Sequence, residues 1–284
     1  MLQEHHEIRE PRLPTELERE IFELASRDEP STRYSLIQVA KRVHKWVEPS
    51  LYCIFIICEG TDVIPSSLFL SSFKERLAVG GSTAIARQAK FVRHLMYTGQ
   101  DMSSVVDLII LCTNIIDLAV WTFPGVPNTS LTTLTTFFDA LHLKRLSVSA
   151  ELIQLYPHCL SSLALSLTHL DCFGMHSPFW DDGWKILNVS HLTHLVVAGS
   201  NIRPIITAIL KESKTIRLVI NAQDNIPSPD ALEGPWYTKD PRYVFCKYPN
   251  PPTACWFKGT NGGDDIWVLG EEAQRRKIQR LSTS

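Results

Sequence analysis

The chain has 284 residues and a formal net charge of −2, and 44% of its residues are hydrophobic and 20% charged. This composition is typical of a folded chain that buries a substantial core, and it argues against overall disorder. The balanced charge gives no indication of a nucleic-acid or membrane-surface partner, and the longest purely apolar stretch, residues 51–58, is too short to cross a bilayer.

The amino-terminal residues 1–12 are charged and contain no apolar core. We therefore expect a disordered tail without a secretory signal. The seven cysteines include no CxxC pair, so we interpret them as reduced thiols and expect an intracellular protein, cytoplasmic or nuclear.

Two helices and a strand are predicted between residues 13 and 57. The first helix begins at Pro14, whose missing N–H has no partner in a first turn, and its apolar stripe is formed by Leu17, Ile21, Leu24 and Ala25. A polar break at 26–33 follows. The second helix, from about 35 to 48, ends before Pro49, and its stripe is formed by Leu36, Val39, Ala40, Val43 and Val47. Residues 51–57 have the composition of a buried strand.

Residues 66–222 contain a near-repeat. Six segments share one apolar and then alternating pattern, built on the anchor leucines Leu95, Leu118, Leu146, Leu170, Leu195 and Leu218. These anchors lie 23, 28, 24, 25 and 23 residues apart, a spacing in the range of leucine-rich repeats, where each unit is one strand plus one helix. Helices are predicted before the strands, at 83–91, 103–113, 129–142, 150–163, 180–189 and 202–213. This alternation predicts a parallel sheet.

The segment 223–284 differs from the repeats in composition, because prolines, glycines and aromatic residues are interleaved in its first part. We expect it to cap the open end of the solenoid. A strand is predicted at 242–248, a short strand or helix entry at 265–269, and a charged helix at 271–281. The run Gly263-Asp264-Asp265 is interpreted as a turn in which an aspartate caps that helix.

The residue before each anchor points away from the leucine, because side chains alternate along a strand. These residues form a predicted polar column on the concave face of the sheet. Two interpretations stay open, a surface that binds a protein or peptide and an ordinary solvated sheet face. Large apolar neighbours favour the first. The candidate target-binding residues are His94, Asp117, Trp121, Arg145, His169, Asp171, Phe173, His194 and Arg217.

Motifs of catalysis are absent from the sequence, which contains no GxSxG, HExxH, GxxxxGK or GxGxxG. The histidines are not accompanied by a cysteine pair that would complete a zinc site. We therefore predict no catalytic residue, no metal and no cofactor. A solenoid presents a surface rather than a catalytic cleft, so we expect the protein to bind a partner.

The amino-terminal segment resembles an F-box, on the residues Leu13-Pro14, Leu17, Ile21-Phe22, Leu36, Val39-Ala40, Val43 and Trp46. It looks like the F-box-like segment of a large fungal group with a leucine-rich-repeat-like body, whose usual ending is resembled by Trp256, Gly259, Gly262, Asp265 and Trp267. The resemblance implies docking on the Skp adaptor of a Skp–cullin–F-box ubiquitin ligase. The adaptor-binding residues that it implies are Leu13, Pro14, Leu17, Ile21, Phe22, Val39, Val43 and Trp46.

Together these features predict an α/β fold, an irregular leucine-rich-repeat solenoid with a parallel sheet and an N-terminal helical F-box-like cap. The expected function is that of a non-catalytic substrate receptor of the ligase, with the adaptor and cullin core and an unknown target protein as partners. The alternative is an interaction scaffold whose F-box-like segment is only a structural cap. The expected parts are the tail 1–12, the F-box-like segment 13–57, the solenoid 66–222 and the capping segment 223–284.

Overall fold

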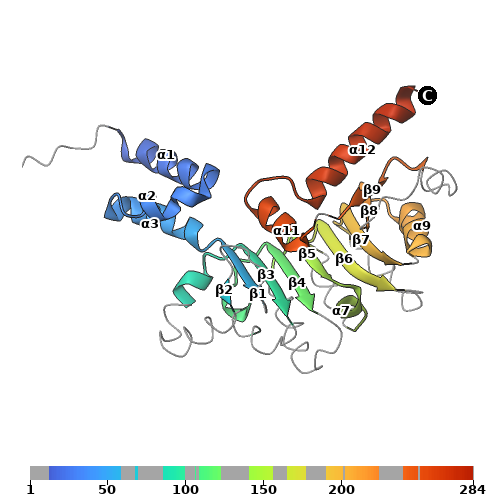
Figure 1. Ribbon diagram of the computed structural model, residues 1–284, viewed down its shortest axis with the longest axis horizontal. Helices are drawn as coiled ribbons and strands as arrows, with labels where there is room; N and C mark the ends of the chain where they lie inside the picture. The colour runs from blue at the N-terminus through green and yellow to red at the C-terminus, as the bar shows by residue number, and fades with distance from the viewer. Residues whose placement is uncertain are drawn as a thin grey trace, which may run out of the picture. The chain divides into compact units, whose positions relative to one another are not determined.

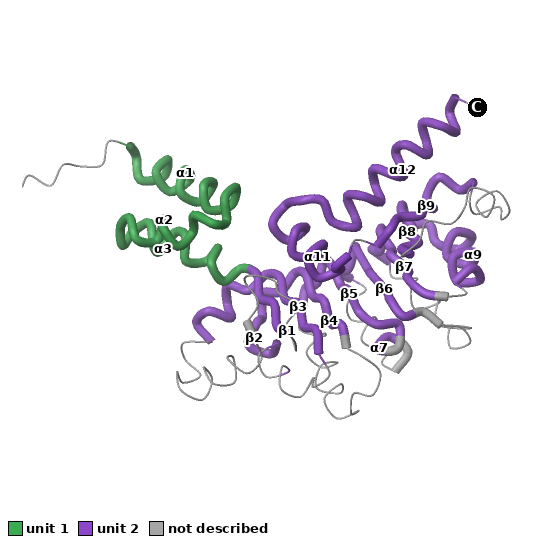
Figure 2. Tube along the Cα trace, in the orientation of Figure 1, with its two compact units in different colours: residues 1–53 green, residues 54–284 purple. Residues whose placement is uncertain are grey.

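The computed structural model (Figure 1) describes residues 13–58, 68–69, 86–99, 106, 109–122, 141–155, 165–176, 190–200, 202–223, 239–248 and 250–283. The chain divides into two compact units, residues 1–53 and residues 54–284 (Figure 2). The second unit begins at Ile54, the first residue of a strand that pairs in its sheet.

The first unit is helical. Its elements are α1 (Thr15–Asp28), the 3-10 helix η1 (Pro30–Thr32), α2 (Arg33–Leu36) and α3 (Lys41–Leu51). The predicted first helix is confirmed, and Pro14 is its N-cap. The prediction of a single second helix is wrong. It is split into α2 and α3, because the backbone of Ala40 is extended, with φ −162° and ψ 156°.

Packing between α1 and α3 holds this unit together. Val43 and Val47 are fully buried, one turn apart on the inner face of α3. The predicted end of this helix before Pro49 is wrong, because α3 continues through Pro49 as far as Leu51, although proline supplies no N–H to the helix. Arg42 donates two hydrogen bonds to Glu18, at 3.0 and 2.7 Å. This pair is exposed, so it contributes little beside the two valines.

The second unit is built on a nine-stranded sheet in the order β2-β1-β3-β4-β5-β6-β7-β8-β9. Every neighbouring pair is parallel, so the predicted α/β fold with a parallel sheet is confirmed. The strands are β1 (Ile54–Cys58), β2 (Leu68–Phe69), β3 (His94–Gly99), β4 (Asp117–Thr122), β5 (Arg145–Ser149), β6 (His169–His176), β7 (His194–Ser200), β8 (Leu218–Gln223) and β9 (Tyr243–Lys247).

The anchor leucines lie in register across five strands. Leu95 pairs with Leu118, and the line continues through Leu146 and Leu170 to Leu195. All five are buried in one apolar core, which also contains residues of α7 (Ala150–Leu155) and α9 (Arg203–Glu212). The predicted inward orientation of these leucines is therefore confirmed.

Four of the six helices predicted in this unit contain residues that are helical in the described part of the chain. Residues 86–89 and 109–111 are helical, as are α7 and α9. The predicted helices at 129–142, except for its last two residues, and at 180–189 lie outside the described residues.

The sixth repeat is displaced by one residue. In the earlier repeats two successive N–H groups just before the anchor donate to one carbonyl of the preceding repeat, as those of Thr168 and His169 do to Lys144. In the last repeat this pair is Arg217 and Leu218, which both donate to Thr193. Leu218 accordingly pairs with His194, and Val219 takes the core position. The prediction that Arg217 belongs to the polar column is therefore wrong.

The carboxy-terminal segment extends the sheet and covers one of its faces. The predicted strand is β9, and two helices follow, α11 (Pro252–Thr260) and α12 (Ile266–Thr283). The predicted last helix is confirmed but starts earlier, whereas α11 was not predicted. Apolar residues of both helices pack on the face opposite the anchor leucines, in a cluster formed by Val196, Leu218, Ile220, Ala222, Val244, Cys255, Ile266 and Trp267.

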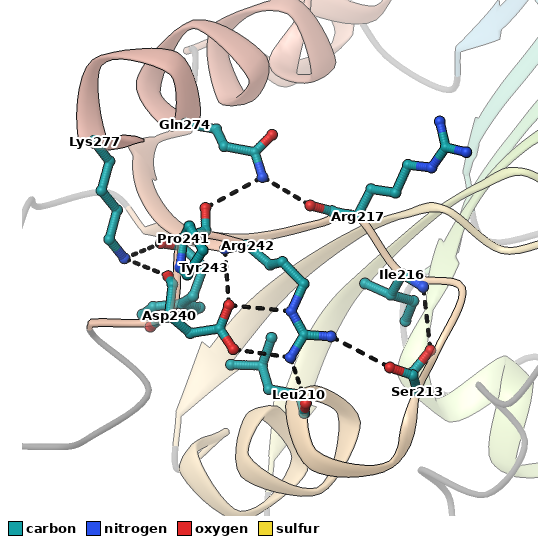
Figure 3. Close-up of polar contacts among 10 residues, drawn as sticks. All are labelled: Leu210, Ser213, Ile216, Arg217, Asp240, Pro241, Arg242, Tyr243, Gln274 and Lys277. Atoms are coloured by element: carbon teal, nitrogen blue, oxygen red, sulfur yellow. Dashed lines mark hydrogen bonds and ion pairs between the residues drawn. The ribbon is translucent and has the colours of Figure 1, made fainter. Parts of the chain in front are cut away.

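A close approach and a polar network fix α12 on the sheet. A Cβ atom on Gly270 would lie 2.2 Å from Cδ1 of Ile220, so only glycine lets the helix come this close. Further along α12, Lys277 donates to the carbonyls of Asp240 and Tyr243, both at 2.6 Å (Figure 3). Gln274 donates to the carbonyl of Arg217 at 2.7 Å. The helix is thereby tied to the loops that precede β8 and β9.

Candidate binding surfaces

The first candidate surface is an exposed apolar stripe on α1. Leu17, Ile21 and Leu24 lie at positions i, i+4 and i+7 and are 49%, 53% and 50% exposed. Leu13 and Val39 are also exposed. An amphipathic helix normally packs its apolar stripe away from water, so this exposed stripe makes α1 a candidate binding surface.

The residues predicted to bind the adaptor fall into three groups. Leu13, Pro14, Leu17, Ile21 and Val39 are exposed, Phe22 and Trp46 are half-buried, and Val43 is buried. Val43 therefore supports the helix pair from within rather than meeting a partner directly. Leu24 was placed on the stripe from its helical spacing but was left out of the predicted binding set.

The second candidate surface is the predicted polar column. The strand register places its first five members side by side, in the order His94, Asp117, Arg145, His169 and His194. The column ends there, because the next position is held by Leu218.

This column is covered in part by the carboxy-terminal helices. Trp256 of α11 donates its indole N–H to Asp117 at 3.3 Å, and Arg145 forms an ion pair with Asp265 at 3.0 Å. Asp117 and Asp171 are only 5% and 4% exposed. The interpretation as an ordinary solvated face therefore does not hold for these two carboxylates, because Trp256 contacts Asp117 from 139 positions away and Tyr248 contacts Asp171 from 77 positions away.

The start of α12 joins the helix to the column. One carboxylate oxygen of Asp265 accepts the backbone N–H groups of Trp267 and Val268, both at 3.0 Å, which is the N-cap predicted for this aspartate. The other oxygen accepts the bond from Arg145. A Cβ atom on Gly259 would lie 2.5 Å from this carboxylate, so glycine is required where α11 passes it.

The two histidines at the end of the column form a stacked pair. The rings of His169 and His194 lie 4.3 Å apart and 5° from parallel, and Trp267 packs edge-on against His169 at 4.9 Å. Burial, with smaller contributions from His194 and Arg145, lowers the pKa of His169 to about 3. Burial also lowers the pKa of His194. Both rings are therefore neutral near neutral pH.

A chain of hydrogen bonds surrounds Asp171. Trp121 donates to the Ser147 hydroxyl, which in turn donates to Oδ2 of Asp171, both at 2.8 Å. The Tyr248 hydroxyl donates to the same oxygen at 2.8 Å. Burial raises the pKa of Asp171 to about 6, although the bonds from Ser147 and Tyr248 act in the opposite direction. Phe173 packs edge-on against Trp121, with ring centroids 6.0 Å apart.

The structure thus brings most of the predicted target-binding residues together and leaves one apart. Asp117, Trp121, Arg145 and Asp171 line a single cavity with residues that sequence reasoning did not assign to a site, namely Tyr248, Cys255, Trp256, Asp265 and Trp267. The aromatic residues gathered in the atypical last segment were the one feature of the sequence from which these residues could have been found. Arg217 is exposed and lies outside the column.

The described residues contain neither a cluster of metal ligands nor a membrane-spanning helix. No group of three or more His, Cys, Asp or Glu side chains is placed there to hold a metal ion. Within the same residues, no helix combines the length and the apolar character that crossing a membrane requires. Among known proteins, no family model and no curated protein matches the chain.

Proposed function

We propose that the protein is a non-catalytic substrate receptor of a Skp–cullin–F-box ubiquitin ligase, which docks on the Skp adaptor through its first unit. The observation that carries this proposal is the exposed stripe of Leu17, Ile21 and Leu24 on α1. The stripe lies in a compact unit of its own, and two of its three residues, Leu17 and Ile21, are among those on which the resemblance to an F-box rests.

The apolar stripe would supply part of the free energy of docking, with the rest coming from other contacts of the first unit. Full burial of a leucine or isoleucine side chain contributes roughly 1.5–3 kcal/mol. Because Leu17, Ile21 and Leu24 are each about half exposed, covering all three would contribute about 3 kcal/mol. Anchors spaced one helical turn apart are the usual means by which a helix seats in an apolar groove.

The alternative function, a scaffold in which the amino-terminal segment is only a structural cap, is less well supported. Within the first unit taken by itself, a purely structural helix pair would pack its apolar stripe between its own helices. Five of the eight predicted adaptor-binding residues are instead exposed.

For the second unit we propose an irregular leucine-rich-repeat solenoid that holds a target protein. The repeated pair of N–H groups that donates to one carbonyl of the preceding repeat supports this, since it recurs from Arg93 to Thr193. On this proposal the cullin core and its associated subunits perform ubiquitin transfer in the cytoplasm or nucleus. The receptor contributes a raised effective concentration of target, with no role for nucleic acid or membrane.

Co-purification with the Skp adaptor tests the proposal. The full chain is expected to capture the adaptor, and the double variant Leu17→Asp with Ile21→Asp is expected to lose it, because two charges enter the apolar contact. The matched control is Tyr34→Asp, since Tyr34 is also exposed in the first unit but lies outside the stripe. Equal capture by all three proteins, or no capture by the unaltered chain, would contradict the proposal.

A further inference from the structure

The last strand of the sheet, β9, forms an open edge. In the described part of the chain no strand lies beyond it. Successive residues of a strand direct their backbone groups to opposite sides. The N–H of Tyr248 donates to the carbonyl of Gln223 on β8, so the even-numbered residues of β9 face the sheet. The odd-numbered residues Tyr243, Phe245 and Lys247 therefore direct their N–H and C=O groups outward.

Two of these three residues have unused backbone groups. Tyr243 is engaged, because its N–H donates to the carbonyl of Asp240 at 3.1 Å and its own carbonyl accepts a hydrogen bond from Lys277 at 2.6 Å. The outward groups of Phe245 and Lys247 have no such partner among the described residues. Phe245 is half-buried and Lys247 is exposed. A strand edge with unpaired N–H and C=O groups is a template on which another extended segment can pair.

The helix α12 overhangs this edge. Lys277 reaches the outward carbonyl of Tyr243 (Figure 3), so this turn of the helix lies at the edge itself. Ile278 and Leu281 follow on the same face of the helix, because they lie four residues after Gln274 and Lys277, which both donate to backbone carbonyls at this end of the sheet. They are 48% and 47% exposed. The apolar side chains of a strand added to β9 would cover them.

The surroundings of the edge are basic. Lys247 is exposed at the end of β9, and Arg275 is exposed on α12. From residue 273 to residue 283 this helix carries four basic residues and no acidic one. Asp240, just before β9, is paired with Arg242 at 2.8 Å. An acidic segment would complement this charge, whereas a basic one would be repelled.

We propose that the edge of β9 and the overhanging face of α12 bind an extended, acidic segment of a partner protein, which adds one strand to the sheet. Its backbone pairs with Phe245 and Lys247, its apolar side chains cover Ile278 and Leu281, and its carboxylates lie among the basic residues. The site is independent of adaptor docking, because all of its residues lie in the second unit and no adaptor enters its test.

A peptide that alternates glutamate and valine tests the site on the full chain. The probe is Glu-Val-Glu-Val-Glu-Val with blocked ends and a fluorescent label, and saturable binding is expected in fluorescence polarisation. The same peptide with every backbone nitrogen methylated is expected not to bind, because it keeps the side chains but has no N–H donor. A peptide with lysine in place of glutamate is expected to bind about tenfold more weakly or worse.

The decisive variant is Lys247→Pro, since proline removes an outward N–H and leaves the hydrogen bonds to β8 intact. It is expected to weaken binding by about tenfold or more. The matched control Lys247→Ala removes the same charge but keeps the N–H, and it is expected to bind within about fivefold of the unaltered chain. The double variant Ile278→Asp with Leu281→Asp is also expected to lose the peptide. Gln279→Asp, which is exposed on the other side of α12, is expected to bind as the unaltered chain does.

The proposal is overturned if the unaltered chain gives no saturable binding, if the methylated or the lysine peptide binds equally well, or if Lys247→Pro binds as Lys247→Ala does. Should Lys247→Pro fail to fold by circular dichroism, amide hydrogen exchange of the unaltered chain decides in its place. The peptide must then slow exchange at Phe245 and Lys247 and leave Val244 unchanged. Dimerisation in sedimentation that the peptide does not compete with, but that Lys247→Pro abolishes, also overturns the proposal, because the occupant would then be a second copy of this chain.

Discussion

Replacing Asp171 by asparagine is expected to stabilise the second unit at neutral pH. The carboxyl group is 4% exposed, and burial raises its pKa from 3.8 to about 6. Asparagine has nearly the same shape, and its carbonyl oxygen can accept the bonds from Ser147 and Tyr248. The substitution therefore removes the buried charge while it keeps the two donors satisfied.

The size of the effect follows from the difference between the two pKa values. A carboxyl group whose pKa is raised by folding stabilises the folded state below the unfolded pKa, and this contribution is lost as the pH rises through the folded pKa. A rise of about two units corresponds to about 3 kcal/mol between pH 4 and pH 7. The variant is accordingly expected to match the unaltered chain near pH 4 and to exceed its stability by up to about 3 kcal/mol near pH 7.

Urea unfolding at a series of pH values measures this difference. The difference between the two proteins must be used, because His169 titrates in the same range with the opposite sign. A histidine that is buried in its neutral form lowers the free energy of unfolding as the pH falls. The buried Asp171 lowers it as the pH rises. A stability difference that does not change between pH 4 and pH 7 would refute the reasoning, since Asp171 would then have an ordinary pKa in the folded protein.

Three other predictions concern the sheet. Leu170→Ala is expected to lower the free energy of unfolding by roughly 2–5 kcal/mol in urea titrations, because Leu170 is fully buried among the anchor leucines; a loss of a few tenths would contradict its place in the core. Leu218→Ala is expected to be far more destabilising than Arg217→Ala, because Leu218 is fully buried in the cluster beneath the carboxy-terminal helices whereas Arg217 is exposed; comparable losses would contradict the burial of Leu218. His169→Gln is expected to make unfolding less sensitive to acid between pH 6.5 and pH 3, because the pKa of His169 is lowered to about 3; unchanged acid sensitivity would show that the ring is not buried in its neutral form.

Much of the sheet could be predicted because one of its faces has a strict pattern. From Leu95 to Leu195 every anchor is apolar and every residue before it is polar, and a shift by one residue would turn the leucines out of the core. The same rule explains the error at β8. Leu218, Val219 and Ile220 are all buried. Because both faces of this strand are apolar, the sequence does not indicate which of these residues face the core.

The covering of the column could not be predicted, because its contacts join distant parts of the chain. Arg145 and Asp265 are 120 residues apart, and Asp117 and Trp256 are 139 residues apart. Local periodicity predicts α12 as a helix with a cap, but it does not say which face of the sheet receives that helix. The break between α2 and α3 was missed for a different reason, since the apolar spacing continues through Ala40 although its backbone is extended.

A buried carboxylate beneath a helical cover needs a physical reason to persist. Around Asp171 the neighbouring strands and helices supply apolar side chains, and an apolar residue at this position would avoid the unpaired oxygen. Such departures from a well-packed core are expected where binding sets the choice of residue. Asp171→Asn is expected to gain stability near pH 7, and a loss of stability there would mean that the carboxylate is needed to hold Ser147 and Tyr248, and with them the strands, in place.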